Sequence, residues 1–253
     1  MNFRICAGVY KKTVTSRDGP ALAWRVIIRP KDRTRCAMLY DPKRKFIFIH
    51  IWKTGGESMV AALRDACPIY FSNRYVNKAI RLTPEISATM IGWRARLVCG
   101  QHLTAHEARQ EMPSETFDSA FKFAFVRNPW DWQVSNYAYA LQTPAHGQHE
   151  IIRDLGSFER YIHYQYEQCA PSQSSFIFGP DGEQLIDFVG RFETLQDDFQ
   201  TVCERIGVQA ELPVLNASNR RRDWRSYYND ETRDLIADLF QRDIEQFGYR
   251  WDA

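Results

Sequence analysis

The chain has 253 residues, of which 44% are hydrophobic and 25% are charged, and its formal net charge is +2. These values are those of a globular domain with a substantial core, and they lack the strongly basic balance expected of a general nucleic-acid binder. The longest apolar run, Phe46 to Trp52, is too short to cross a bilayer, so we expect no membrane span.

The cysteines and the amino terminus bear on the compartment. Six cysteines are scattered along the chain without C-x-x-C spacing, which favours a reducing compartment and no structural metal. The first residues lack the apolar core of a signal peptide. We therefore expect a cytoplasmic protein.

The first elements lead to a glycine turn. Residues 1–45 contain short β-like runs, and we expect them to form a hairpin or a lid at the start of a single domain spanning 1–253. Phe46 to Trp52 predicts a strand with apolar residues on both faces, as a central parallel strand requires. A helix is expected from Glu57 to Ala66.

The later elements alternate between strands and helices. We expect strands at Leu97–Gly100, Phe121–Val126 and Asp187–Phe192, and helices at Thr104–Met112, from Asn128-Pro129 onward, at Leu195–Gly207 and at Asp230–Phe247. This alternation predicts an α/β fold, a P-loop-like three-layer domain in which helices flank a central parallel sheet. In such sheets ligands gather at the carboxyl ends of the strands.

The turn after the first central strand has the composition of an anion site. Lys53, Thr54 and Ser58 surround Gly55 and Gly56. Glycines let the backbone approach a phosphate, the first amides of the helix point at it, and the lysine adds a full charge. The lysine precedes the glycines, unlike G-x-x-x-x-G-K-[ST], and no acidic strand end stands out for magnesium, so we expect no metal.

A second strand, turn and helix supply another anion site. Arg127 ends the strand Phe121–Val126, and Ser135 follows about 9 Å along the next helix. An arginine fork beside a hydroxyl suits a phosphate. Two separate phosphate sites imply a ligand that is phosphorylated at two places.

These two stretches resemble the donor-binding motifs of carbohydrate sulfotransferases of the heparan 2-O-sulfotransferase type (sulfotransferase family 2). The 5′-phosphosulfate loop corresponds to Ile49-His50-Ile51-Trp52-Lys53-Thr54-Gly55-Gly56-Glu57-Ser58, and the 3′-phosphate motif to Phe125-Val126-Arg127-Asn128-Pro129-Trp130-Asp131 followed by Ser135. Phe188–Glu193 and Tyr227–Tyr249 are also similar to that family.

The resemblance implies the donor 3′-phosphoadenosine 5′-phosphosulfate (PAPS), which carries phosphates at two places, and a carbohydrate or glycoconjugate acceptor. It implies that the donor is bound by Lys53, Thr54, Gly55, Gly56, Glu57, Ser58, Met59, Arg127 and Ser135. Two positions depart from the family, which usually has proline at Trp52 and threonine at Glu57. We expect Trp52 to loosen the loop or to cover the ligand, and Glu57 to turn outward.

Sulfuryl transfer needs a base for the acceptor hydroxyl and positive charge for the leaving oxygen. We assign the charge to Lys53 and the base to His102, which lies between an expected strand and an expected helix and has a side chain whose ordinary pKa suits base work. The resemblance points to the same histidine.

Other polar and aromatic residues near these motifs have simpler interpretations. We expect His50 in the core, His106 on the helix surface or at the acceptor, and Trp130 and Trp132 in packing roles. One of the arginines Arg220, Arg221 and Arg222 would contact the 3′-phosphate, as the resemblance implies.

Two other functions remain open. A kinase with a degenerate P-loop would bind ATP and need magnesium, whereas a nucleotide-binding module would bind the donor without turnover. Nucleic acid is a poor fit, because the basic residues lack regular aromatic interleaving.

Overall fold

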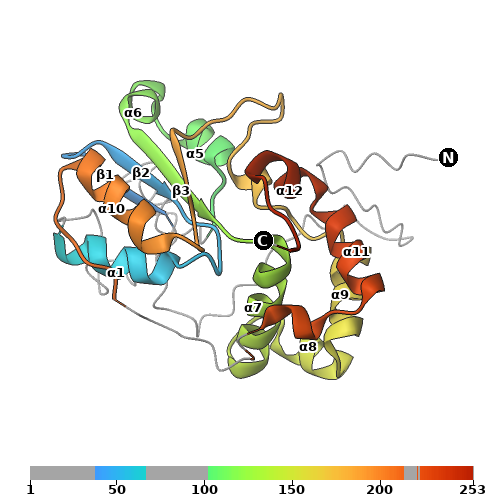
Figure 1. Cartoon of the computed structure of the whole chain (residues 1–253). Coiled ribbons are helices and arrows are strands. Elements are labelled where there is room, and N and C mark those ends of the chain that lie inside the picture. The colour runs from blue at the N-terminus through green and yellow to red at the C-terminus, as the bar shows by residue number, and fades with distance from the viewer. Residues whose placement is uncertain (1–37, 67–101, 214–220, 222, 253) are drawn as a thin grey trace, which may run out of the picture.

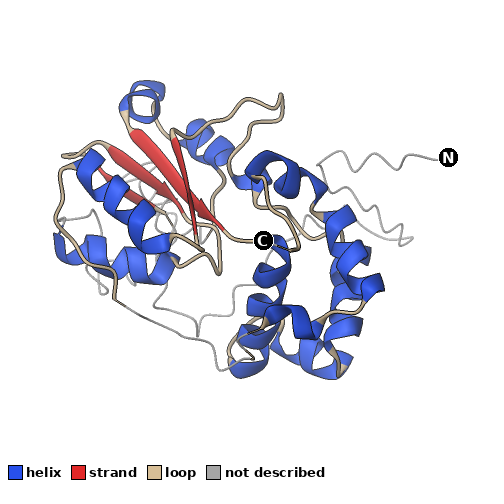
Figure 2. Cartoon of the chain, in the orientation of Figure 1, coloured by secondary structure: helices blue, strands red, loops and turns tan. Residues whose placement is uncertain are grey.

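The strands of the described residues form one central sheet (Figures 1 and 2). The computed structural model describes residues 38–66, 102–213, 221 and 223–252. The sheet order is β1-β2-β3-β4, with β1 at Leu39–Asp41, β2 at Phe46–Ile49, β3 at Phe121–Val126 and β4 at Phe188–Arg191. Strands β2, β3 and β4 are parallel, as predicted, whereas β1 pairs with β2 in the antiparallel direction through a short hairpin. The expected strand Leu97–Gly100 lies outside the described residues.

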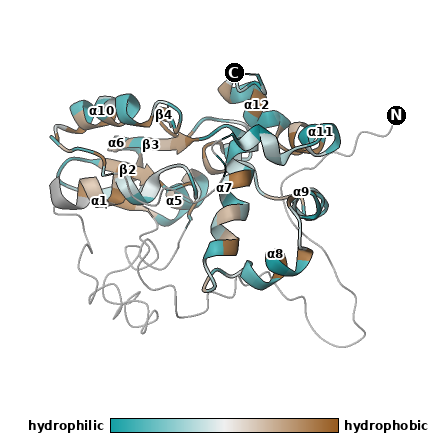
Figure 3. Ribbon diagram, turned by 60° about the horizontal axis from the view of Figure 1, so that its bottom comes forward, coloured by the Kyte–Doolittle hydropathy of each residue, from teal (hydrophilic) through white to brown (hydrophobic). Residues whose placement is uncertain are grey.

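The central strands are apolar on both faces, which is why helices cover both sides of the sheet. Phe46 and Phe48 point to one face of β2, while Ile47 and Ile49 point to the other, and all four are fully buried. Phe48 stands opposite Phe123 of β3, and their rings stack with centroids 5.1 Å apart. Both strands carry the colour of hydrophobic residues in Figure 3.

Two helical layers enclose the sheet. Helices α1 (Gly56–Ala66) and α10 (Leu195–Ile206) pack on the phenylalanine face. Helices α5 (Ala105–Glu111), α6 (Ser114–Ser119) and α7 (Pro129–Gln142) contribute to the core on the opposite face. The arrangement is therefore mixed α/β, with a four-stranded sheet flanked by helices.

The other helices of the described residues gather beside α7, beyond the end of the sheet (Figure 1). They are α8 (His149–Leu155), α9 (Phe158–Glu167), α11 (Asp230–Leu239), α12 (Gln241–Phe247) and the short 3-10 turns η1 (Ser174–Phe176) and η2 (Trp224–Tyr227). The sequence did not predict α8 or α9. Among the described residues, no helix combines the length and the apolar character that crossing a membrane requires.

The predicted single helix Asp230–Phe247 is wrong, because the chain breaks at Phe240 into α11 and α12. Phe240 leaves the helical conformation with φ −111° and ψ 28°. Its side chain is fully buried and packs edge-on against Trp132, with ring centroids 5.6 Å apart. The break lets Asp243 of α12 bind the backbone of η1, so tertiary packing overrides a helical sequence pattern.

Local signals at helix ends were more reliable. Thr104 and Glu107 form the expected capping box at α5, and the Asn128 side chain accepts from the amides of Trp130 and Asp131 at the start of α7. Gly207 ends α10 in the left-handed conformation. Because β2 and β3 are parallel neighbours, the turns that follow them lie at the same edge of the sheet.

Candidate functional site

The turn after β2 has a backbone that requires its glycines. Lys53 has φ 61° and Gly55 has φ 88°, and α1 begins at Gly56. A Cβ atom at Gly56 would lie 2.0 Å from Nε2 of His50. His50 is buried, as expected, and its ring occupies the space that a side chain at position 56 would need.

The carbonyl groups that lead into this turn are held by side chains. Four successive carbonyl oxygens accept hydrogen bonds: His50 from Nδ1 of His102 (3.0 Å), Ile51 from Oγ1 of Thr54 (2.8 Å), Trp52 from Nε1 of Trp132 (2.7 Å) and Lys53 from Nη1 of Arg127 (3.0 Å). Carbonyl oxygens repel anions, so satisfying them within the protein leaves the loop suited to a negatively charged ligand.

The first turn of α1 contains the remaining residues of the predicted loop. Gly55 accepts from the amides of Ser58 (3.1 Å) and Met59 (3.3 Å). Ser58 is buried, Glu57 is half-exposed, and the side chain of Met59 lies in the core against the sheet. A contribution of Met59 to a ligand site would therefore come from its main chain.

Arg127, at the end of β3, is buried and fixed from several directions. Its Nε and Nη2 atoms both lie 2.6 Å from Oδ2 of Asp131, four residues along the chain. The guanidinium stacks on the ring of Phe192 at 3.8 Å and also donates to the carbonyl of Lys53. The structure thus brings the two predicted anion sites into direct contact.

The backbone of Arg127 is held by Gln173. The Gln173 side chain accepts from the Arg127 amide and donates to the Arg127 carbonyl, both at 2.8 Å. The carboxylate of Asp243 accepts from the amides of Gln173 (2.8 Å) and Ser174 (2.7 Å). Burial raises the pKa of Asp243, and these hydrogen bonds oppose that rise. Helix α12 therefore fixes the backbone of Arg127 through two buried side chains, Asp243 and Gln173.

Glu193 supports the start of α7. One carboxylate oxygen accepts from the Asn128 amide (2.7 Å) and the other from the Tyr249 hydroxyl (3.0 Å). Burial, together with the negative charge of Glu193, raises the pKa of Tyr249, which keeps this hydroxyl protonated as a donor. Two segments noted for their family resemblance, Phe188–Glu193 and Tyr227–Tyr249, thus brace the arginine motif.

The side chain of Lys53 extends to α7. Its ammonium lies over the ring of Tyr139, 3.8 Å from the ring centroid. Asp131, Ser135 and Tyr139 are spaced four residues apart, which places them along one face of α7. Ser135 is buried between the other two. It lies one helical turn after Asp131, which pairs with Arg127, and one turn before Tyr139, which contacts Lys53.

His102 lies exposed beside the loop. Because a carbonyl oxygen only accepts hydrogen bonds, the contact of Nδ1 with His50 places the ring proton on Nδ1 and the lone pair on Nε2. The ring of Trp52 lies edge-on to the imidazole, with centroids 5.5 Å apart. This tautomer suits a base, because Nε2 can accept a proton.

Trp52 is packed rather than loosely placed. Its half-buried ring contacts Trp132 (5.1 Å between centroids) and Phe176 (5.2 Å) as well as His102. The aromatic contacts and the hydrogen bond to its carbonyl hold this position of the loop, and whether Trp52 loosens the loop or covers the ligand stays a prediction. Trp130 and Trp132 have the packing roles expected of them and are buried.

Other predicted residues lie farther from these contacts. His106 is half-exposed on α5 and pairs with Gln110. Arg221 is exposed and stacks on Tyr227 at 5.5 Å, whereas Arg220 and Arg222 lie outside the described residues.

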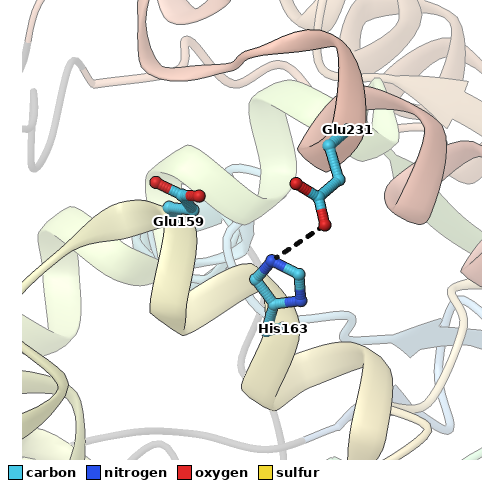
Figure 4. Close-up of side chains that lie close together, drawn as sticks. All are labelled: Glu159, His163 and Glu231. Carbon is cyan, nitrogen blue, oxygen red and sulfur yellow. Dashed lines mark ion pairs between the residues drawn. The ribbon is translucent and has the colours of Figure 1, made fainter.

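A separate polar cluster joins α9 and α11 (Figure 4). The ligand-type atoms of Glu159, His163 and Glu231 lie within 4.8 Å of one another, and His163 is 3.5 Å from Glu231. Both glutamates are exposed, and an ion pair between the two helices accounts for the arrangement.

Sequence reasoning missed residues that organise the site, namely Asp131, Tyr139, Gln173 and Asp243. The four-residue spacing of Arg127 and Asp131 at a helix start was a usable signal. Gln173 and Asp243 gave none, because their contacts depend on tertiary structure.

Comparison with known proteins points the same way as the geometry. The profile of the sulfotransferase family matches residues 37–250. An uncharacterized protein of Archaeoglobus fulgidus is 26% identical over 106 residues, which are 42% of this chain and 83% of that protein. No solved structure matches the chain.

Proposed function

The chain belongs to the sulfotransferase family, and on that premise we propose that it transfers a sulfuryl group from PAPS to a hydroxyl of a carbohydrate or glycoconjugate. The donor is bound by residues 53–59, Arg127 and Ser135. One observation carries the proposal: Arg127, from the second motif, donates to the main chain of Lys53, in the first. Two anion sites in contact fit one ligand with two phosphorylated positions.

The chemistry assigns one role to each of two side chains. The acceptor oxygen forms a bond to sulfur while the bond between sulfur and the 5′-phosphate oxygen breaks. Nε2 of His102 takes the proton of the acceptor hydroxyl, and the Lys53 ammonium stabilises the charge on the leaving oxygen. The hydrogen bond from His102 to the carbonyl of His50 supports this tautomer.

The loop supports PAPS over ATP. Lys53 precedes the two glycines, and the Thr54 side chain, which directly follows the lysine, is fully buried with its hydroxyl directed at the carbonyl of Ile51. A kinase needs a hydroxyl on magnesium at that place. We therefore assign the donor without a metal ion.

Calorimetry tests the donor before the acceptor is known. The full chain is titrated with adenosine 3′,5′-bisphosphate and with ATP, each with and without magnesium. We expect the bisphosphate to bind in the presence of a chelator and ATP to bind more weakly. Magnesium-dependent ATP binding without bisphosphate binding would favour the kinase.

Turnover is then measured as release of adenosine 3′,5′-bisphosphate from PAPS in the presence of mixed saccharides. Bisphosphate binding with no turnover would instead favour a nucleotide-binding module.

A further inference from the structure

The face of one aromatic ring carries the ammonium that the proposed reaction needs. We propose that Tyr139 is a positioning residue that holds Lys53 for sulfuryl transfer, an inference that rests on the proposed function. The ammonium nitrogen of Lys53 lies 3.8 Å from the centroid of the Tyr139 ring, well within the range of a cation–π contact.

Arg127, two residues before α7, and Tyr139 on α7 fix Lys53 at two points. The carbonyl oxygen is bound by Arg127 at 3.0 Å, and the ammonium lies on Tyr139, twelve residues further along the chain. A free lysine side chain samples many rotamers, and fixing both ends removes much of that freedom before the reaction begins. Preorganised charge is more effective than charge that must be ordered during the reaction.

An aromatic ring suits this place better than a carboxylate. A carboxylate beside Lys53 would neutralise the ammonium and repel the phosphates of the donor. The face of a phenol ring attracts a cation through its quadrupole and carries no net charge. The Tyr139 ring therefore holds the ammonium without adding a negative charge beside the donor.

The ring is itself supported. His146 packs against Tyr139 at nearly a right angle, with an interplanar angle of 87° and ring centroids 5.5 Å apart. Tyr137, two residues earlier on α7, packs instead against Phe158 and Tyr161. Tyr137 thus offers a matched control, since it is another tyrosine of the same helix with different contacts.

The first test observes the contact directly. NMR of the lysine-labelled full chain, with Lys53 assigned by Lys53→Gln, should show Cε protons shifted upfield by the ring current. The shift should persist in Tyr139→Phe and Tyr137→Leu, and disappear in Tyr139→Leu. Absence of the shift in the wild type would overturn the proposal, whatever the chain binds.

The second test measures release of adenosine 3′,5′-bisphosphate from PAPS. We expect Tyr139→Leu to lower kcat by about three- to thirtyfold, the equivalent of a cation–π contact, with little change in bisphosphate affinity. Tyr139→Phe should retain turnover, because it keeps the ring. Loss of turnover in Tyr139→Phe, or an equal loss in Tyr137→Leu, would overturn the positioning role.

Ring fluorination keeps the test valid if Tyr139→Leu does not fold. Phenylalanine carrying one, two or three fluorine atoms at position 139 keeps the shape while weakening the negative potential of the ring face. Turnover should fall with each fluorine, and a flat series would overturn the proposal. If the wild type binds no bisphosphate while the upfield shift is present, the proposed donor fails but the contact between Lys53 and Tyr139 stands.

Discussion

Arg127 and Lys53 lie 74 residues apart in the sequence, yet the guanidinium of Arg127 donates to the carbonyl oxygen of Lys53 at 3.0 Å. The same guanidinium pairs with Asp131 at 2.6 Å and is almost fully buried. One side chain therefore joins the turn after β2 to the start of α7. A change at Arg127 should disturb both anion sites.

Arg127→Ala is expected to weaken donor binding and to destabilise the fold. Removing one partner of a buried ion pair typically costs about 3–5 kcal/mol, because it leaves the other charge uncompensated. A double-mutant cycle with Asp131→Ala, measured by urea unfolding, separates the loss of the ion pair from the other effects of each substitution on stability. We expect the double variant to be more stable than the sum of the two single changes predicts.

Arg127→Lys provides the variant for binding, since it keeps the charge and removes the planar fork. Adenosine 3′,5′-bisphosphate affinity should fall in this variant while the fold is retained. Unchanged affinity in Arg127→Lys, together with additive effects in the cycle, would contradict the assigned role.

Lys53→Ala should reduce turnover of PAPS by roughly two to three orders of magnitude, the usual cost of removing a group that stabilises a developing oxyanion. The comparison is with Lys122→Ala, whose lysine is buried elsewhere against Asp187 and the carbonyl of Ala120. Lys122→Ala should lower stability and leave the turnover of the folded protein near wild type. A wild-type rate in Lys53→Ala would remove its role.

His102→Ala should lower turnover by roughly two to four orders of magnitude, as for a lost general base, and spare bisphosphate affinity. His106→Ala is the control, because His106 lies on the neighbouring helix and pairs with Gln110. Rates are compared at saturating donor with a saccharide mixture. Equal losses in the two variants would point to a general effect on this segment.

Much of the fold followed from local sequence patterns. The alternation of Phe and Ile in β2 placed that strand at the centre of the sheet, and Asn128-Pro129 marked the start of α7. Such signals are carried by neighbouring residues, so they can be read without tertiary structure. The same patterns placed Lys53 and Arg127 at strand ends, and parallel pairing of β2 with β3 brought them together.

The errors have a common physical cause. Phe240 breaks a helix that its neighbours favour, because its ring is buried against Trp132 and Asp243 binds the backbone of η1. Gln173 reached Arg127 from a segment with no predicted element. These contacts are set by packing between distant segments, which periodicity along the chain does not encode.

Gly56→Ala should damage the loop selectively. The new Cβ would meet the buried imidazole of His50 at 2.0 Å, and overpacking of this kind typically costs about 1–3 kcal/mol. The carbonyl of His50 holds His102, so displacement of His50 should also lower turnover. Gly147→Ala is the control, since nothing lies within 4 Å of its Cβ position. Equal stability of the two variants would contradict the crowding at Gly56.

Asp243 predicts a dependence of stability on pH. Burial raises its pKa above the ordinary value of 3.8, so the folded state binds the proton more tightly than the unfolded state. The stability linked to this proton is fully present below about pH 3.8 and is lost as the pH rises through the raised pKa. Asparagine does not titrate, so in an Asp243→Asn variant position 243 adds no pH dependence to the free energy of unfolding.

The stability advantage of the wild type over Asp243→Asn should therefore shrink as the pH rises over the range above about pH 3.8. Urea unfolding of both proteins across this range measures it, with Asp118→Asn, an exposed aspartate of α6, as the control for removing a carboxylate. If the stability advantage of the wild type over Asp243→Asn instead grows with pH, the hydrogen bonds from the amides of Gln173 and Ser174 outweigh the effect of burial on the pKa of Asp243. In that case the carboxylate, rather than the carboxylic acid, would be the form that the fold prefers beneath Arg127.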